Sequence, residues 1–130
     1  MSEKTTKIHQ FNPQVYPRLL WIVVGYDKAV KASLHDYFGD FGDMDKDAEA
    51  EVFNVHCKKP KPRGGLLIWF RSKAAMTTGI ITHESDHVAI EIFDYCNCKI
   101  AVDNQEPFTY LAGWVADCCD QVKRNKFKDE

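Results

Sequence analysis

Residues 19–26 have the sequence LLWIVVGY, a continuous apolar run that is rich in β-branched and aromatic side chains. Pro17 precedes the run and Gly25 lies near its end, so both boundaries carry residues that interrupt regular structure. A short apolar run without polar alternation is typical of a strand that is buried on both faces. We therefore expect residues 19–26 to form a central strand of a sheet.

The segments that follow this strand alternate between helical and strand patterns. Val30, Leu34 and Phe38 recur at helical spacing, and Gly39 follows where a helix would end. The expected elements are a helix over 28–38, strands over 52–57 and 66–71, and helices over 77–95 and about 104–123. This order predicts one small α+β domain over residues 1–130, with looser ends near 1–12 and 125–130.

The composition is that of a soluble globular protein. The 130 residues are 45% hydrophobic and 28% charged, with a formal net charge of -2, which provides no general attraction to nucleic acid or to an anionic membrane. No signal peptide and no membrane-spanning run are visible, so we expect a cytoplasmic protein. The five cysteines are an odd number without a secretory signal, which predicts reduced thiols.

Residues 39–47 form an acidic segment, GDFGDMDKD, in which aspartates alternate as in the first half of a calcium-binding loop. The sharp-turn position that requires glycine holds Ala48, and the position of the bidentate glutamate holds Asn54. The pattern therefore favours a solvated loop over a calcium site.

The segment with the clearest chemistry is HESDH at residues 83–87, within the helix expected over 77–95. H-E-x-x-H on a helix puts two imidazoles one turn apart on one face, where both can bind one metal ion. His83 and His87 are therefore candidate zinc ligands. Glu84 follows the first histidine directly and could take a proton from a metal-bound water.

A catalytic zinc site usually has three protein ligands and one open position. The longer pattern with a third histidine is absent, because its glycine position holds Ile90 and its histidine position holds Phe93. Glu106 lies at the start of the next expected helix, which a helical hairpin could bring back towards the middle of the preceding helix. We expect Glu106 to be the third ligand, with Asp103 as the alternative.

On these residues, over roughly 83–117, the chain resembles the gluzincin branch of the zincin metallopeptidases, in which H-E-x-x-H is completed by a glutamate on a following helix. It is also similar to small zincin-like proteins of phage and prophage genomes. The resemblance implies a minimal zincin-like domain with a small mixed sheet, a backing helix, an active-site helix and a C-terminal helix carrying the glutamate. It further implies zinc on His83, His87 and Glu106, with Glu84 as the general base. One departure is Tyr110, where thermolysin-like enzymes have aspartate.

The implied activity is that of a zinc-dependent hydrolase, a metallopeptidase that cleaves amide bonds in a peptide or protein substrate. Tyr110 could donate a hydrogen bond to the oxyanion, or it could simply pack between helices. Residues 66–71 could be the strand along which an extended substrate binds, or an ordinary core strand. The alternative of a different class is a catalytically silent zincin-fold protein that binds or regulates a partner.

Overall fold

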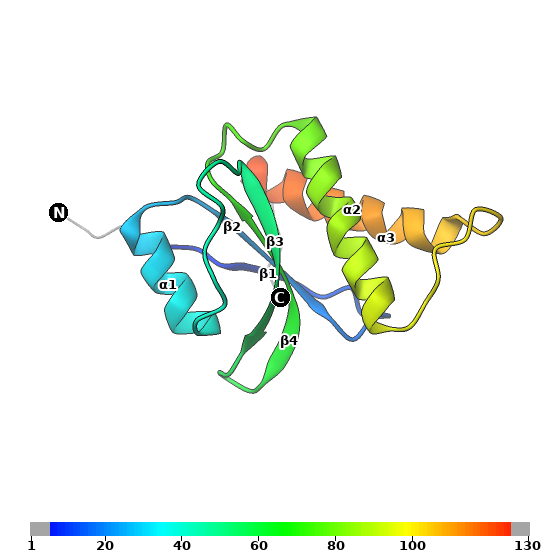
Figure 1. Cartoon of the computed structure of the whole chain (residues 1–130), viewed down its shortest axis with the longest axis horizontal. Helices are drawn as coiled ribbons and strands as arrows, with labels where there is room; N and C mark the ends of the chain where they lie inside the picture. Colours follow the sequence, from blue (N-terminus) through cyan, green and yellow to red (C-terminus); the bar gives the residue numbers. More distant parts are fainter. Residues whose placement is uncertain (1–5, 126–130) are drawn as a thin grey trace.

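The computed structural model describes residues 6–125 and contains one mixed sheet with three helices (Figure 1). The elements are, in chain order, β1 (His9–Phe11), β2 (Leu19–Val24), α1 (Lys28–Phe38), β3 (Ala50–Cys57), β4 (Arg63–Phe70), α2 (Thr78–Tyr95) and α3 (Glu106–Lys123). The strands lie in the order β1-β2-β4-β3. The predicted α+β class is confirmed at this level.

Strand β2 is an interior strand, as the apolar run predicted. It pairs antiparallel with β1 and parallel with β4, and Leu20, Trp21, Ile22 and Val23 are completely buried. The chain leaves the strand through Gly25, whose φ of 129° lies in the region that favours glycine. A Cβ at this position would also lie 2.9 Å from Val30 Cγ2, so Gly25 allows β2 to pass directly into α1.

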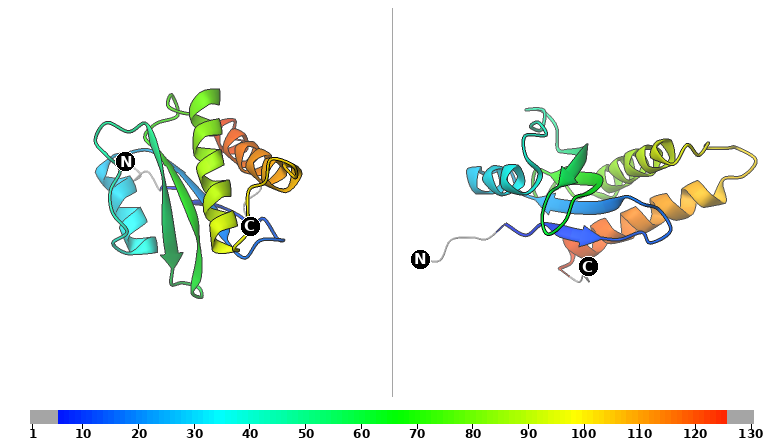
Figure 2. Two further views of the ribbon diagram at one scale, coloured as in Figure 1. Left: turned by 45° about the vertical axis from the view of Figure 1, so that its right-hand side comes forward. Right: turned by 90° about the horizontal axis from the view of Figure 1, so that it is seen from below.

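The sheet separates two hydrophobic cores, because successive side chains of a strand point to opposite faces. Leu20 and Ile22 of β2 pack with Leu66 and Ile68 of β4 against α2 and α3. Trp21 and its neighbours on the other face pack against α1. Figures 1 and 2 show this arrangement, with α1 on one side of the sheet and α2 and α3 on the other.

Two features of the fold depart from the sequence-based expectation. Residues 9–11 form the edge strand β1, although the polar start of the chain indicated a loose end. Ile81, Val88, Ile92 and Tyr95 fall on one apolar stripe of the helix predicted over 77–95, so Tyr95 was expected in the core. Tyr95 is instead 57% exposed, because it lies in the last turn of α2, where its ring stacks under the Arg18 guanidinium. None of the helices in the part of the chain that the structure describes is long and apolar enough to cross a membrane.

Candidate metal and catalytic site

Helix α2 positions the H-E-x-x-H segment. Thr77 caps the helix by accepting a hydrogen bond from the Ile80 backbone N–H, and the helix then runs without interruption to Tyr95. Ile81, Val88 and Ile92 of its predicted apolar stripe are buried, and only Tyr95 at the end of the helix is not. The two histidines lie on the exposed side of the same helix. One face of α2 therefore anchors the helix while another presents the imidazoles.

His83 and His87 converge on one point. Their Nε2 atoms are 3.1 Å apart, and the two rings are nearly perpendicular, with 4.6 Å between centroids. Two imidazole nitrogens bound to one tetrahedral zinc at about 2.0 to 2.1 Å would be about 3.3 Å apart. The pair is thus spaced for a shared ion with almost no movement of either ring.

Glu84 lies on the buried side of the same helix. Its side chain is only 6% exposed, and its Oε2 atom has no hydrogen-bond partner among the described residues. Burial raises the pKa of this carboxyl, the two imidazoles act in the opposite direction, and Glu51 raises it further. A carboxylate with a raised pKa is better suited to holding a proton than an exposed one.

A small pocket of about 280 Å³ opens beside the pair, between α2 and β3. Its lining consists of side chains from both elements, namely Glu51, Val52, Asn54, Glu84, His87 and Glu91. Strand β3 is the edge of the sheet, whereas β4 lies between β2 and β3. The idea that residues 66–71 receive an extended substrate is therefore wrong, because both edges of β4 already pair with neighbouring strands. Strand β3 is the edge available at this pocket.

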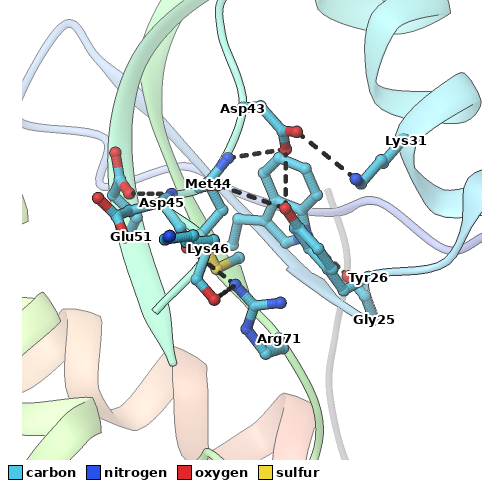
Figure 3. Close-up of polar contacts among 10 residues, drawn as sticks. Gly25, Tyr26, Lys31, Asp43, Met44, Asp45, Lys46, Glu51 and Arg71 are labelled. Atoms are coloured by element: carbon cyan, nitrogen blue, oxygen red, sulfur yellow. Dashed lines mark hydrogen bonds and ion pairs between the residues drawn. The ribbon is translucent and has the colours of Figure 1, made fainter. Parts of the chain in front are cut away.

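The acidic loop before β3 helps to orient Glu51 (Figure 3). Glu51 Oε1 accepts a hydrogen bond of 3.1 Å from the Asp45 backbone N–H. Arg71 in turn donates to the backbone carbonyls of Ala48 at 2.6 Å and Asp45 at 2.8 Å, and its guanidinium lies 3.9 Å from the centre of the Tyr26 ring. Arg71 therefore fixes the loop that fixes Glu51.

The aspartates of this loop make local contacts. Asp43 accepts hydrogen bonds from the Met44 backbone N–H at 2.8 Å and the Tyr26 hydroxyl at 3.4 Å, and it pairs with Lys31 at 3.5 Å. Asp45 Oδ1 accepts from the Asp47 backbone N–H. These contacts give the Asp43 and Asp45 carboxylates structural roles in the loop.

Glu106 is the first residue of α3 and is exposed. Helix α3 crosses α2, and the Phe108 ring, one turn into α3, packs on Phe93 near the end of α2, with 5.5 Å between centroids. Further along α3, the Cys119 thiol lies against Ser85. The first turn of α3 thus meets α2 about 9 Å along the axis from His87, whereas a third ligand was expected near its middle.

The link between the helices explains this offset. It covers residues 96–105 and contains a small turn closed by a bridge between Ala101 and Asn104. In Figures 1 and 2 the first turn of α3 lies to one side of α2, and the later turns cross it. Across residues 6–125, no group of three His, Cys, Asp or Glu side chains is close enough to hold a metal ion. Neither Glu106 nor Asp103 is therefore gathered with the histidine pair.

Tyr110 lies away from the pair. It is 75% exposed and lines a different, apolar depression with Pro13, Val15 and Trp114. The expected alternative, a tyrosine packed between helices, does not describe it either. Conversely, Glu51, Asn54 and Glu91 line the pocket of the pair but belong to no recognisable motif. Only the position of β3 beside α2 identifies them, and that position depends on the sheet topology.

The chain was compared with protein-family models, curated proteins and solved structures. No protein-family model, curated protein or solved structure matches the chain.

Proposed function

We propose that the protein is a zinc-dependent hydrolase of amide bonds, with His83 and His87 as zinc ligands and Glu84 as general base. The observation that carries the proposal is the convergence of the two Nε2 atoms, 3.1 Å apart, on the helix that also carries the buried Glu84 carboxylate. Two neutral imidazoles are a donor pair that zinc prefers. The third ligand stays a prediction, with Glu106 first and Asp103 second; because neither is gathered with the pair, either one would have to approach it when zinc binds.

The residues divide the chemistry between them. Zinc, when bound, supplies the Lewis acidity that polarises a carbonyl and makes its bound water easier to deprotonate. The imidazoles hold their Nε2 atoms close together, and the Glu84 carboxylate would take up a proton from the attacking water and return it to the leaving amine. The edge of β3 offers backbone hydrogen-bonding groups along which an extended peptide can align.

The second candidate is a zincin-fold binding protein without turnover. It is favoured by one observation, the absence of a three-ligand group among residues 6–125. The position of Tyr110 outside the pocket also leaves the oxyanion without the donor that the sequence suggested.

Zinc content measures the first part of the proposal. Protein prepared at neutral pH with added zinc should retain about one zinc per chain after desalting, and His87→Ala should lose it. His56→Ala is the matched control, because His56 is an exposed histidine on β3 outside the motif. A parent protein that retains no zinc, or a His87→Ala variant that retains as much as the parent, would exclude the histidine pair.

Hydrolysis measures the second part. Glu84→Gln preserves the shape of the side chain and removes the base, so it should keep zinc and abolish cleavage of a peptide library. Zinc binding without cleavage by the parent protein would favour the silent binding protein. Cleavage by Glu84→Gln at the parent rate would exclude Glu84 as the base.

A further inference from the structure

We propose that a second pocket, at one end of the sheet, binds a phosphate group, either as inorganic phosphate or as the phosphate ester of a small molecule. This pocket has a volume of about 400 Å³ and lies between residues 12–18, which join β1 to β2, and the turn that joins β3 to β4. It shares no lining residue with the pocket beside the histidine pair, so it goes beyond the proposed hydrolase and does not require zinc.

The lining of this pocket contains three cationic side chains and no carboxylate. The cations are Arg18, Lys61 and Arg63. Within residues 6–125 none of them forms an ion pair, and the two guanidinium groups donate to neutral acceptors, Arg18 to Asn54 Oδ1 and Arg63 to Gln10 Oε1 at 3.2 Å. Like charges placed close together repel one another unless an anion compensates them. A bound anion would supply that compensation.

Both guanidinium groups keep a donor that a ligand can reach. Their Nη2 atoms make the hydrogen bonds to the protein, and their Nε atoms are enclosed without a partner. Within the described residues, the Nη1 atoms of Arg18 and Arg63 are neither hydrogen-bonded nor enclosed, so they are open to solvent. Asn12 adds a neutral donor to the lining, because its Oδ1 already accepts the Gln14 N–H at 2.7 Å and its NH₂ group is left to donate.

Arg18 is held in position before any ligand arrives. Its guanidinium stacks on the Tyr95 ring, 4.4 Å from the centroid, while it donates to Asn54. A Cβ at Gly64 would collide with Arg18 Nη1, so this open nitrogen lies directly over a residue that lines the pocket. A donor fixed in advance loses less conformational entropy when it binds a ligand.

This set of donors suits phosphate better than other anions. A phosphate monoester carries close to two negative charges at pH 8 and three acceptor oxygens, which match two guanidinium groups and one ammonium group. A carboxylate has one charge and two oxygens, so it would leave part of the set unused. Nucleic acid carries its charges singly along a chain, whereas these cations are confined to one pocket. The volume also leaves room for a small molecule attached to the phosphate.

The test uses the zinc-free full-length protein at pH 8, so that phosphate cannot bind through zinc. Inorganic phosphate, glycerol 3-phosphate and acetate are titrated separately, and amide NMR shifts locate the site. Both phosphates should shift the amides of residues 12–18 and 61–65 and bind at least about tenfold more tightly than acetate. Tighter binding of glycerol 3-phosphate would identify an esterified ligand, and tighter binding of inorganic phosphate would identify the free ion.

Substitutions in the turn between β3 and β4 test the assignment of the donors. Lys61→Gln and Arg63→Gln should each weaken phosphate binding about tenfold, because each removes a charged donor. Lys58→Gln is the matched control, since it removes the same charge from the same turn but lines a different pocket, and it should weaken binding less than about twofold. Because Lys61 is exposed, Lys61→Gln keeps the test valid even if Arg63→Gln fails to fold.

Four results would each overturn the phosphate site. They are acetate binding as tight as phosphate binding, shifts that centre on residues 83–87, an equal loss of affinity in Lys58→Gln and Lys61→Gln, and tighter binding of a single-stranded oligonucleotide without terminal phosphates than of glycerol 3-phosphate. The last result would assign these cations to nucleic acid.

Discussion

Replacing Glu84 with glutamine should stabilise the zinc-free protein at pH 8. The side chain is only 6% exposed and its Oε2 atom lacks a partner, so the folded state contains a poorly solvated negative charge. An unsatisfied buried polar group costs about 1 to 3 kcal/mol. Glutamine removes the charge but still buries an amide, so we expect a gain at the lower end, about 1 kcal/mol. In a domain of this size that corresponds to a rise in Tm of about 4 °C.

The pH dependence of this gain has a definite sign. Burial raises the pKa of the Glu84 carboxyl in the folded state, so the folded protein holds its proton to higher pH than the unfolded chain does. The parent therefore loses stability as pH rises from the ordinary carboxyl range through the raised pKa, and then levels off. Glu84→Gln lacks this loss, so its unfolding free energy should exceed that of the parent by a margin that grows over this pH window. The margin should disappear at low pH, where Glu84 of the parent is protonated in both the folded and the unfolded state.

The assay is thermal and urea unfolding of chelator-treated protein, followed by circular dichroism from pH 4 to 8. Asp86→Asn serves as the control, because it makes the same change of charge at an exposed position of the same helix. Its unfolding free energy should stay within about 0.5 kcal/mol of the parent. A Glu84→Gln protein that is less stable than the parent at pH 8, or an advantage that does not change with pH, would refute the description of Glu84 as a buried carboxylate without a partner.

Three further predictions concern the loop, the core and the third ligand. Arg71→Gln should lower the unfolding free energy in urea by about 2 kcal/mol, because it removes hydrogen bonds to loop carbonyls and a cation–π contact. An unchanged value would contradict the role of Arg71 in holding the loop before β3. Ile92→Ala should cost about 3 kcal/mol, and Ile90→Ala, 43% exposed, less than about 1 kcal/mol. In zinc titrations Glu106→Ala should weaken binding at least about tenfold and Asp103→Ala little; the reverse order would move the third ligand into the link.

Much of the fold could be predicted from local sequence patterns. The apolar run of β2 has the length and composition of a strand buried on both faces, and the stripe of α1 and the buried face of α2 repeat with the helical period, so the pattern and the packing agree. Strand β1 could not be predicted, because three residues are too few to show a period and its pairing with β2 is decided by tertiary contacts.

Some residues of the candidate site could likewise be predicted from local sequence, and others depend on tertiary packing. His83, Glu84 and His87 lie on one helix, so their spacing determined their juxtaposition, and the structure brings the two rings together. Glu106 depends instead on the register of α3 against α2, which the packing of Phe108 on Phe93 sets and which no local pattern encodes. Glu51 depends on the order of strands in the sheet.

The position of β3 at the edge of the sheet has a consequence for the behaviour of the protein in concentrated solution. An edge that is open to a substrate peptide is equally open to the same strand of another molecule, and exposed edges are common starting points for aggregation. Charged side chains on or beside an edge strand discourage such pairing, and β3 carries Glu51 and is followed by Lys58 and Lys59. Neutralising Glu51 would therefore reduce the solubility of the protein.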